Sequence, residues 1–203
     1  MFARRTPRFV TLIGAAVALL PAAVTAQGTP QSKALSPELA SAKAALEKYQ
    51  DPVLAVHDGY FSTIGCIEYS VAGGQGDMAY PKGGMGVHFL NAGLIGPTLD
   101  PSKPQVLIYE PVSGGKLRLA AAEWFVPVQL SKEAPTIFGH KLMGPMEGHE
   151  PVIPAAMHHW DLHVWLWKTN PAGMFSPTNP GVACGKSGHA YSFDDKPPKM
   201  VMP

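Results

Sequence analysis

The chain has 203 residues, a formal net charge of +1 and only 15% charged residues. A chain of this length can bury the core of one domain, and its balanced charge offers no basic surface of the kind that nucleic-acid-binding proteins carry. Scarce charge together with 21 glycines and 21 prolines indicates a loop-rich β-type protein rather than a helical bundle. The apolar residues occur in concentrated runs, which argues against disorder.

Residues 1–26 have the pattern of a signal peptide: arginines, then an apolar run at 9–20, then small residues at 24–26. The run is shorter than the roughly 20 residues that cross a bilayer as a helix. We therefore expect export to the periplasm or the extracellular space, without a stable membrane anchor after cleavage. A Sec-type signal is the simplest interpretation, and the pair Arg4-Arg5 leaves the twin-arginine route open.

Cys66 and Cys184 are the two cysteines of the chain, and they lie far apart in sequence. In an oxidising compartment they are expected to form one disulfide between an early segment and the C-terminal loop region. The alternative is a soft-metal role for the two thiols.

A helical segment is predicted after a polar leader at 27–34. Ser36 is a suitable N-cap and Pro37 fits the first helical position. Apolar residues then follow at helical spacing, namely Leu39, Ala42, Leu46 and Tyr49. Asp51 and the proline after it end this helix and begin a second, shorter one.

Strands are predicted for the short apolar runs rich in Val, Ile, Trp and Phe, separated by glycine-rich loops. These runs are 85–90, 105–109, 116–128 and 162–167. Residues 139–154 and the chain from Asn170 onwards are predicted to be irregular. The expected fold is α+β: an N-terminal helical segment on a mostly antiparallel β-sheet or partial barrel, with one disulfide. One domain would span 35–193, followed by a flexible tail at 194–203.

Residues 157–163 read Met-His-His-Trp-Asp-Leu-His and lead into an apolar run. Imidazole is the commonest protein ligand for borderline transition metals. On a strand, His159, Asp161 and His163 would point to one side of the sheet and His158 to the other. On a helix, His159 and His163 would still share a face. Both conformations therefore predict these two histidines as metal ligands, with Asp161 as a third ligand or as the group that orients an imidazole. A polar cluster in a loop is the alternative.

Glu123 lies in a predicted strand whose neighbours at every second position are apolar, which would aim its carboxylate at an apolar face. A carboxylate buried there must be paired, hydrogen-bonded, protonated or bound to a metal. His88, after a glycine-rich approach, could complete the site, although a lone strand histidine is more often structural. The prediction is a mononuclear transition-metal site of Zn, Cu, Fe or Mn. Its ligands would be His88, Glu123, His159 and His163.

A second pattern has two methionines flanked by two histidines, each three residues from the next: His140, Met143, Met146 and His149. Soft thioethers select Cu(I), and imidazole suits copper in either oxidation state. The pattern favours a non-catalytic copper-binding or carrier protein as an alternative function. An irregular loop that covers the main site would explain the same residues.

Three histidines and a glutamate in an export-targeted β-rich chain resemble the ligand set of the cupins, which usually hold one metal on these residue types. In cupins the glutamate follows two histidines spaced one residue apart, whereas Glu123 here precedes His159 and His163. Residues 158–167, with the Asn-Pro pairs at 170–171 and 179–180, also resemble a signature of secreted bacterial proteins of unassigned function. That resemblance implies a periplasmic or extracellular bacterial protein and no particular chemistry.

No nucleophile elbow, P-loop or dinucleotide-binding motif occurs in the sequence. The main hypothesis is an exported metal-binding protein with its site beside a cleft lined by Trp160 and Trp165. If it is an enzyme acting on a small organic substrate, Asp161 or His158 would be the nearest proton-transfer group. A copper carrier and a metal-free module for a small ligand are the two alternatives.

Overall fold

The structure is a computed structural model that describes residues 34–75, 78–149, 153–185, 192–193 and 199–201. The predicted signal peptide and nearly all of the polar leader lie outside the described residues. In the part of the chain that the structure describes, no helix is both long enough and apolar enough to cross a membrane.

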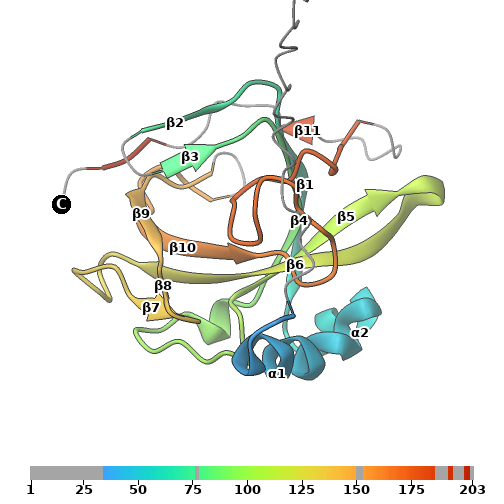
Figure 1. Ribbon diagram of the computed structural model, residues 1–203, viewed down its shortest axis with the longest axis horizontal. Helices are drawn as coiled ribbons and strands as arrows, with labels where there is room; N and C mark the ends of the chain where they lie inside the picture. The colour runs from blue at the N-terminus through green and yellow to red at the C-terminus, as the bar shows by residue number, and fades with distance from the viewer. Residues whose placement is uncertain (1–33, 76–77, 150–152, 186–191, 194–198, 202–203) are drawn as a thin grey trace, which may run out of the picture.

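The helical segment begins and continues as its caps and apolar stripe predict (Figure 1). It consists of α1 (Pro37–Leu46), the 3-10 helix η1 (Glu47–Gln50) and α2 (Pro52–His57). The side chain of Ser36 accepts a hydrogen bond from the backbone N–H of Leu39 at 3.3 Å. Asp51 caps α2 by accepting from the N–H of Val53 at 2.9 Å. The predicted apolar stripe is buried along its whole length.

Seven strands form the main sheet, in the order β11-β1-β4-β5-β6-β10-β9. All neighbouring pairs are antiparallel except β1 with β11, so the predicted α+β fold is confirmed. The bounds are β1 (Phe61–Tyr69), β4 (Gly83–Leu90), β5 (Val106–Val112), β6 (Lys116–Pro127), β9 (Met143–Met146), β10 (His159–Val164) and β11 (Ser192–Phe193). Two small ladders join β2 (Gly73–Gln75) to β3 (Met78–Tyr80) and β7 (Thr136–Ile137) to β8 (His140–Lys141). Short 3-10 turns lie at η2 (Ala92–Leu94) and η3 (Ser113–Gly115).

The strands β4, β5, β6 and β10 overlap the four apolar runs from which strands were predicted, although β10 ends at Val164, three residues before its run does. The strand β1 was not predicted, and β8, β9 and β11 lie in segments that were expected to be irregular. The strand β9 reads Met-Gly-Pro-Met, and a Gly-Pro pair on its own indicates a turn. Pairing with β10 nevertheless makes it an edge strand, the position at which a sheet tolerates proline.

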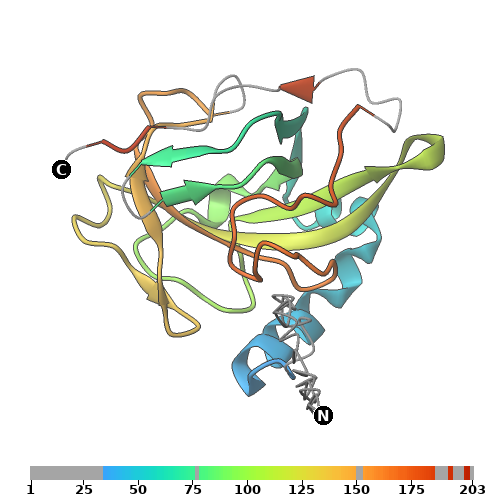
Figure 2. The same cartoon turned by 45° about the horizontal axis from the view of Figure 1, so that its top comes forward.

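One face of the sheet packs against the helices, and the other face curls around a separate interior (Figures 1 and 2). Leu46 and Tyr49 from the helical segment share the larger hydrophobic cluster with Trp124 and Leu162. On the other face, Met146 of β9 packs in one cluster with residues of β1, β3 and β4. Strands at opposite ends of the sheet order therefore meet, which makes the sheet strongly curved and encloses its concave face.

The predicted disulfide is present and ties β1 to the C-terminal loop, with Cys66 and Cys184 joined at an S–S distance of 2.07 Å. The loop region contains the two Asn-Pro pairs. Asn170 accepts from the N–H of Ala172 at 3.0 Å, and Asn179 accepts from the N–H of Gly181 at 2.9 Å. Both asparagines therefore close a turn two residues ahead, so turn chemistry explains the recurrence.

Part of the C-terminal segment pairs with the sheet. The N–H of Glu147 donates to the carbonyl of Lys199, and the N–H of Val201 donates to that of Pro145, both at 2.9 Å. Residues 199–201, which belong to the predicted flexible tail, therefore extend the edge beside β9. The other residues of that tail lie outside the described ranges.

Asp58 follows α2 and joins the end of this helix to η1. Its carboxylate contacts the Lys48 ammonium at 2.6 Å, the His57 ring at 2.9 Å and the Tyr49 hydroxyl at 3.1 Å. The hydrogen bond from Lys48, followed by those from His57 and Tyr49, holds the pKa of Asp58 well below its ordinary value. Folding therefore favours the ionised form of Asp58 over the protonated form.

We expect Asp58→Asn to lower the free energy of unfolding at pH 7. A carboxyl group whose pKa is depressed in the folded state stabilises the fold above its unfolded pKa of about 4 and loses that contribution as the pH falls. The difference between variant and wild type should therefore shrink below about pH 4. Urea denaturation between pH 7 and pH 3 measures this. Glu133→Gln, which removes an exposed carboxylate elsewhere, is the matched control.

Candidate metal centre

Strand β10 delivers three of the candidate ligands to the concave face of the sheet. His159, Asp161 and His163 occupy alternate positions, and all three are fully buried. The intervening residues Trp160 and Leu162 pack into the hydrophobic cluster on the helical side. The period-2 alternation predicted from the sequence therefore holds along this strand.

Glu123 reaches the same face from β6. It lies directly opposite His163 in the β6–β10 ladder and opposite Val106 in the β5–β6 ladder. The whole residue is only 3% exposed, so the predicted inward orientation is confirmed. A register shift between β5 and β6 sends Leu119, expected on the same face, into the helical-side cluster instead. Arg118 pairs with Glu110, so this cation does not serve Glu123.

His88 reaches the site from β4 because of an irregularity at Gly86. Ile67 of β1 pairs with Gly86, and the next residue of β1 pairs with Gly84, so Met85 is an extra residue in the ladder. Gly86 has a φ of +92°. Such a bulge changes which side chains share a face: Met85 packs in the concave-face cluster, three residues before His88.

We expect Gly86→Ala to lower the free energy of unfolding by about 1–3 kcal/mol and to weaken metal binding by moving His88. A Cβ at this position would lie 2.6 Å from the carbonyl oxygen of Tyr109, on a backbone that L-residues rarely adopt. Urea denaturation and zinc titration measure the two effects. In contrast, Gly96→Ala should change neither, because a Cβ on Gly96 would meet no other atom within 4 Å and its φ is ordinary.

The first triad consists of His88, Glu123 and His163, which come from three different strands. The Nε2 atoms of the two histidines lie 3.5 Å and 3.6 Å from the same carboxylate oxygen, Glu123 Oε2. One ligand atom from each residue lies within 4.8 Å of the others. Two imidazoles and a carboxylate are a common ligand set for zinc and for non-haem iron.

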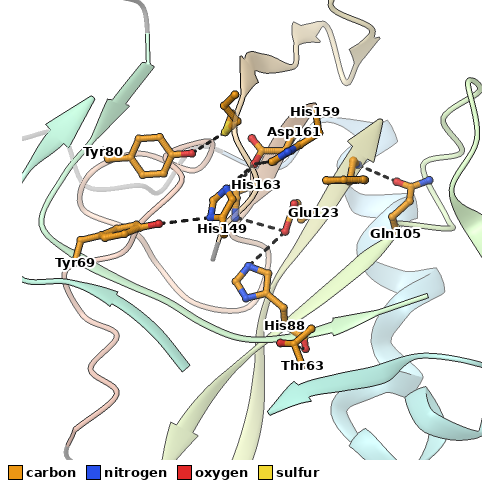
Figure 3. A network of polar contacts seen from close by, with 12 residues as sticks. Thr63, Tyr69, Tyr80, His88, Gln105, Glu123, His149, His159, Asp161 and His163 are labelled. Atoms are coloured by element: carbon orange, nitrogen blue, oxygen red, sulfur yellow. Dashed lines mark hydrogen bonds and ion pairs between the residues drawn. The ribbon is translucent and has the colours of Figure 1, made fainter. Parts of the chain in front are cut away.

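The second triad consists of His149, His159 and Asp161. The Nε2 atoms of His149 and His159 lie 4.0 Å and 3.6 Å from Asp161 Oδ2. His149 follows β9, and in the sequence it belonged only to the alternative copper pattern. Because it lies in a loop, no alternation of apolar and polar residues predicts which way its side chain points. Figure 3 shows the six side chains of both triads converging on one region.

The triads hold all eight buried side-chain polar atoms without a hydrogen-bond partner among the described residues. They include both ring nitrogens of His163, both carboxylate oxygens of Asp161 and Glu123 Oε2. An unsatisfied buried polar group costs about 1–3 kcal/mol, and native proteins keep few of them. Their concentration in a set of metal-ligand side chains is the main chemical feature of the molecule.

Two of the imidazoles are oriented by contacts at Nδ1, the ring nitrogen that does not face the carboxylate of the triad. The Nδ1 of His159 lies 3.1 Å from the carbonyl oxygen of Met157, and the Nδ1 of His149 lies 3.5 Å from the hydroxyl of Tyr69. An Nδ1–H that donates to the carbonyl leaves the Nε2 of His159 with a free lone pair, which faces Asp161. Such partners are typical of metal-bound histidines.

Burial sets the protonation of the cluster. It lowers the pKa of His88 to about 3, with a further contribution from His163, and it lowers the pKa values of His149 and His163. Burial, followed by the charge of Asp161, raises the pKa of Glu123 well above its ordinary value. Burial therefore holds the imidazoles of His88, His149 and His163 neutral, which is the form that binds metals, and a cation would restore the ionised form of Glu123.

Asp161 is the exception. Burial acts to raise the pKa of Asp161, but the contact with His159 and the neighbouring imidazoles outweigh it and lower the pKa. Asp161, one of the two predicted proton-transfer groups, lies inside the second triad. His158 is half-buried beside β10, and neither triad includes it.

The two predicted cleft residues lie in different parts of the protein. Trp160 packs in the helical-side cluster and donates its indole N–H to the carbonyl of Ser131 at 3.0 Å. Trp165 packs with Val106 and Ile108 and donates to the carbonyl of Ser176 at 2.6 Å. A surface pocket next to Trp165 also involves Trp167 but not Trp160.

The four residues of the His-Met pattern are also separated. His140 is exposed on β8 and stacks on Phe175, with 3.9 Å between ring centroids. Met146 is fully buried and accepts a hydrogen bond from the hydroxyl of Tyr80 at 3.0 Å. Met143 is partly buried in the same cluster, and His149 belongs to the second triad.

A small cavity touches both triads. It is lined by Ile67, His88, Glu123, His149 and Ile153. Its volume is about 10 Å³, which is about the space that one water molecule needs. Any group that approaches an ion at the first triad through this cavity must be very small.

Comparison with known proteins assigns no family. No family model matches the chain, and no curated protein or solved structure matches it. The function is therefore argued from the chemistry of the two triads.

Proposed function

We propose that this protein is an exported metal-binding protein that holds one transition-metal ion at the first triad, His88, Glu123 and His163. Two of the eight unpartnered buried atoms, Glu123 Oε2 and His163 Nε2, carry the proposal, because a cation bound at the first triad would satisfy both. The disulfide supports an oxidising compartment. His159, the fourth ligand expected from the sequence, lies in the second triad and contacts Asp161.

The geometry fits an ion with little rearrangement. Donors bonded to one tetrahedral zinc at about 2.0–2.1 Å lie about 3.3 Å apart. The two Nε2–Oε2 distances of the first triad are 3.5 Å and 3.6 Å, so small side-chain movements suffice. Zinc and iron suit this donor set best, while copper and manganese are also compatible with it.

Three protein ligands leave one coordination position for an exogenous group, which is the usual arrangement in catalytic rather than structural zinc sites. The small cavity lies beside His88 and Glu123, where such a group would enter. The site therefore favours an enzyme over a structural metal centre, and the group that reaches the ion through this cavity would be about the size of a water molecule, smaller than the organic substrate expected from the sequence. The ion would supply Lewis-acid chemistry.

The proposal is tested by the metal content of protein exported to an oxidising compartment. We expect at least one equivalent of a transition metal in the wild type, measured by elemental mass spectrometry. Glu123→Gln keeps the side-chain volume but removes the charge, and it should reduce occupancy of the first triad at least tenfold at limiting metal. His57→Ala, at an exposed histidine, should retain full occupancy. A wild type that takes up no metal would refute the proposal and favour a metal-free module.

The exchangeable position has a separate test. Protein loaded with Co²⁺ should change its visible spectrum when azide is added, because a small anion would enter the ligand field. A spectrum that does not respond to azide would indicate a closed site and a non-catalytic role. Glu123→Gln should lack the Co²⁺ spectrum of the first triad and so provides the control.

A further inference from the structure

We infer that the second triad binds a second metal ion and that the imidazole of His163 bridges the two ions. The inference rests on the proposed function, since it requires the first ion at His88, Glu123 and His163. It adds a site at His149, His159 and Asp161 and gives His163 a ligand role toward both ions.

The second triad has the same donor types as the first and, like it, holds four of the eight unpartnered buried atoms. Its three residues are between 0% and 8% exposed. The Nε2 of His149, the Nε2 of His159 and both oxygens of Asp161 have no hydrogen-bond partner among the described residues. The contacts at the Nδ1 atoms of the two histidines come from Tyr69 and Met157, outside the triad, so both Nε2 atoms remain directed at the carboxylate.

His163 connects the triads through opposite sides of one ring. Its Nε2 lies 3.6 Å from Glu123 Oε2, and its Nδ1 lies 4.0 Å from Asp161 Oδ2. Both nitrogens are buried and lack hydrogen bonds within the described part of the chain. A neutral imidazole always carries one N–H, and a buried N–H without an acceptor is costly. Two ions, one at each nitrogen, would remove this cost.

Bridging requires the loss of one proton from the neutral His163 ring. The remaining N–H bond of the neutral His163 ring breaks, the electron pair stays on nitrogen to bind the second ion, and the proton leaves to solvent. Two divalent cations facing one imidazolate and the carboxylates of Glu123 and Asp161 leave a net charge of +1 in the cluster. Without the imidazolate the buried cluster would hold +2, which is more costly in a medium of low dielectric constant.

The bridge would make the two ions unequal. The first ion would have three protein ligands and the cavity beside it. The second would have His163 in addition to the second triad, and thus four protein ligands, as closed structural zinc sites do. The second ion would then hold His163 in place for the first, and the reactive position would belong to the first ion alone.

Metal stoichiometry of the full chain, stripped with a chelator and reloaded with Zn²⁺, tests the second site. We expect two ions per chain in the wild type and one in His149→Gln and in His159→Gln. Asp161→Asn keeps the side-chain shape and should also bind one ion. His140→Gln, at an exposed histidine outside both triads, should bind two. Circular dichroism of the metal-free variants must match the wild type.

The bridge itself is tested with Cu²⁺. Two Cu²⁺ ions joined by an imidazolate are exchange coupled, so the fully loaded wild type should show a weaker paramagnetic resonance signal per copper than the singly loaded His159→Gln variant. Binding of the second ion should also release one proton beyond those displaced from the carboxylates, detected with a pH indicator. Two uncoupled copper signals would overturn the bridge.

The outcomes separate this inference from the function on which it rests. One ion that is lost in Glu123→Gln but retained in His149→Gln and His159→Gln would overturn the second site and leave the first in place. One ion that is lost in His159→Gln and retained in Glu123→Gln would overturn the first. A wild type without metal overturns both.

Discussion

Replacing both Cys66 and Cys184 by alanine is expected to lower the free energy of unfolding by about 4–5 kcal/mol. The disulfide joins residues that are 118 positions apart, so it removes much of the chain entropy of the unfolded state. It also fixes the C-terminal loop to β1, where the N–H of Cys184 donates to Glu68 Oε2 at 2.6 Å. Few other contacts in this protein are expected to have so large an effect.

Urea denaturation of wild type and the double alanine variant measures the difference, provided that both unfold in one cooperative transition. Reductant supplies the matched control: it should destabilise the wild type by a similar amount and leave the double alanine variant unchanged. A loss below about 1 kcal/mol would mean that the unfolded chain is restricted in some other way.

Zinc at about a thousand times its dissociation constant is expected to raise the free energy of unfolding by about 4 kcal/mol. The ligands come from distant parts of the chain and meet only in the folded protein, so an ion binds the folded state preferentially. Because burial lowers the pKa of His88 to about 3, that ring is already in its metal-binding form at neutral pH.

The shift should grow with the logarithm of free zinc concentration, and a denaturation series at several buffered zinc concentrations measures it. Magnesium, a hard cation that prefers oxygen ligands, should give no comparable stabilisation at the same concentrations. In Glu123→Gln the zinc effect should be smaller. Equal stabilisation of wild type and this variant would place the bound zinc outside the first triad.

The local sequence was sufficient for features that depend on neighbours within a few residues. Ser36 and Asp51 cap the helices because a short polar side chain can reach a free N–H of the first turn. The alternation in β10 turns His159 and His163 to one face because successive strand residues point to opposite sides. Glu123 follows the same rule, so its burial was predictable before its partners were known.

Other features needed partners that local patterns do not identify. The strand β9 exists because β10 pairs with it, although its own sequence indicates a turn. The orientation of His88 depends on where the extra residue at Met85 falls in the ladder with β1. No apolar periodicity marks His149, whose place in the second triad follows from the path of the chain after β9.

The sequence by itself determined the helical caps, four strands of the main sheet, the disulfide pair and the ligand types: imidazoles with an inward-facing carboxylate. Only the tertiary structure decided how these ligands are grouped. It separated His159 and Asp161 from His88, Glu123 and His163, and it added His149 to them to form a second triad. The physical reason is the curvature of the sheet, because strand register and closure set the distances between residues far apart in the chain, whereas the local sequence sets only which side of a strand each residue occupies.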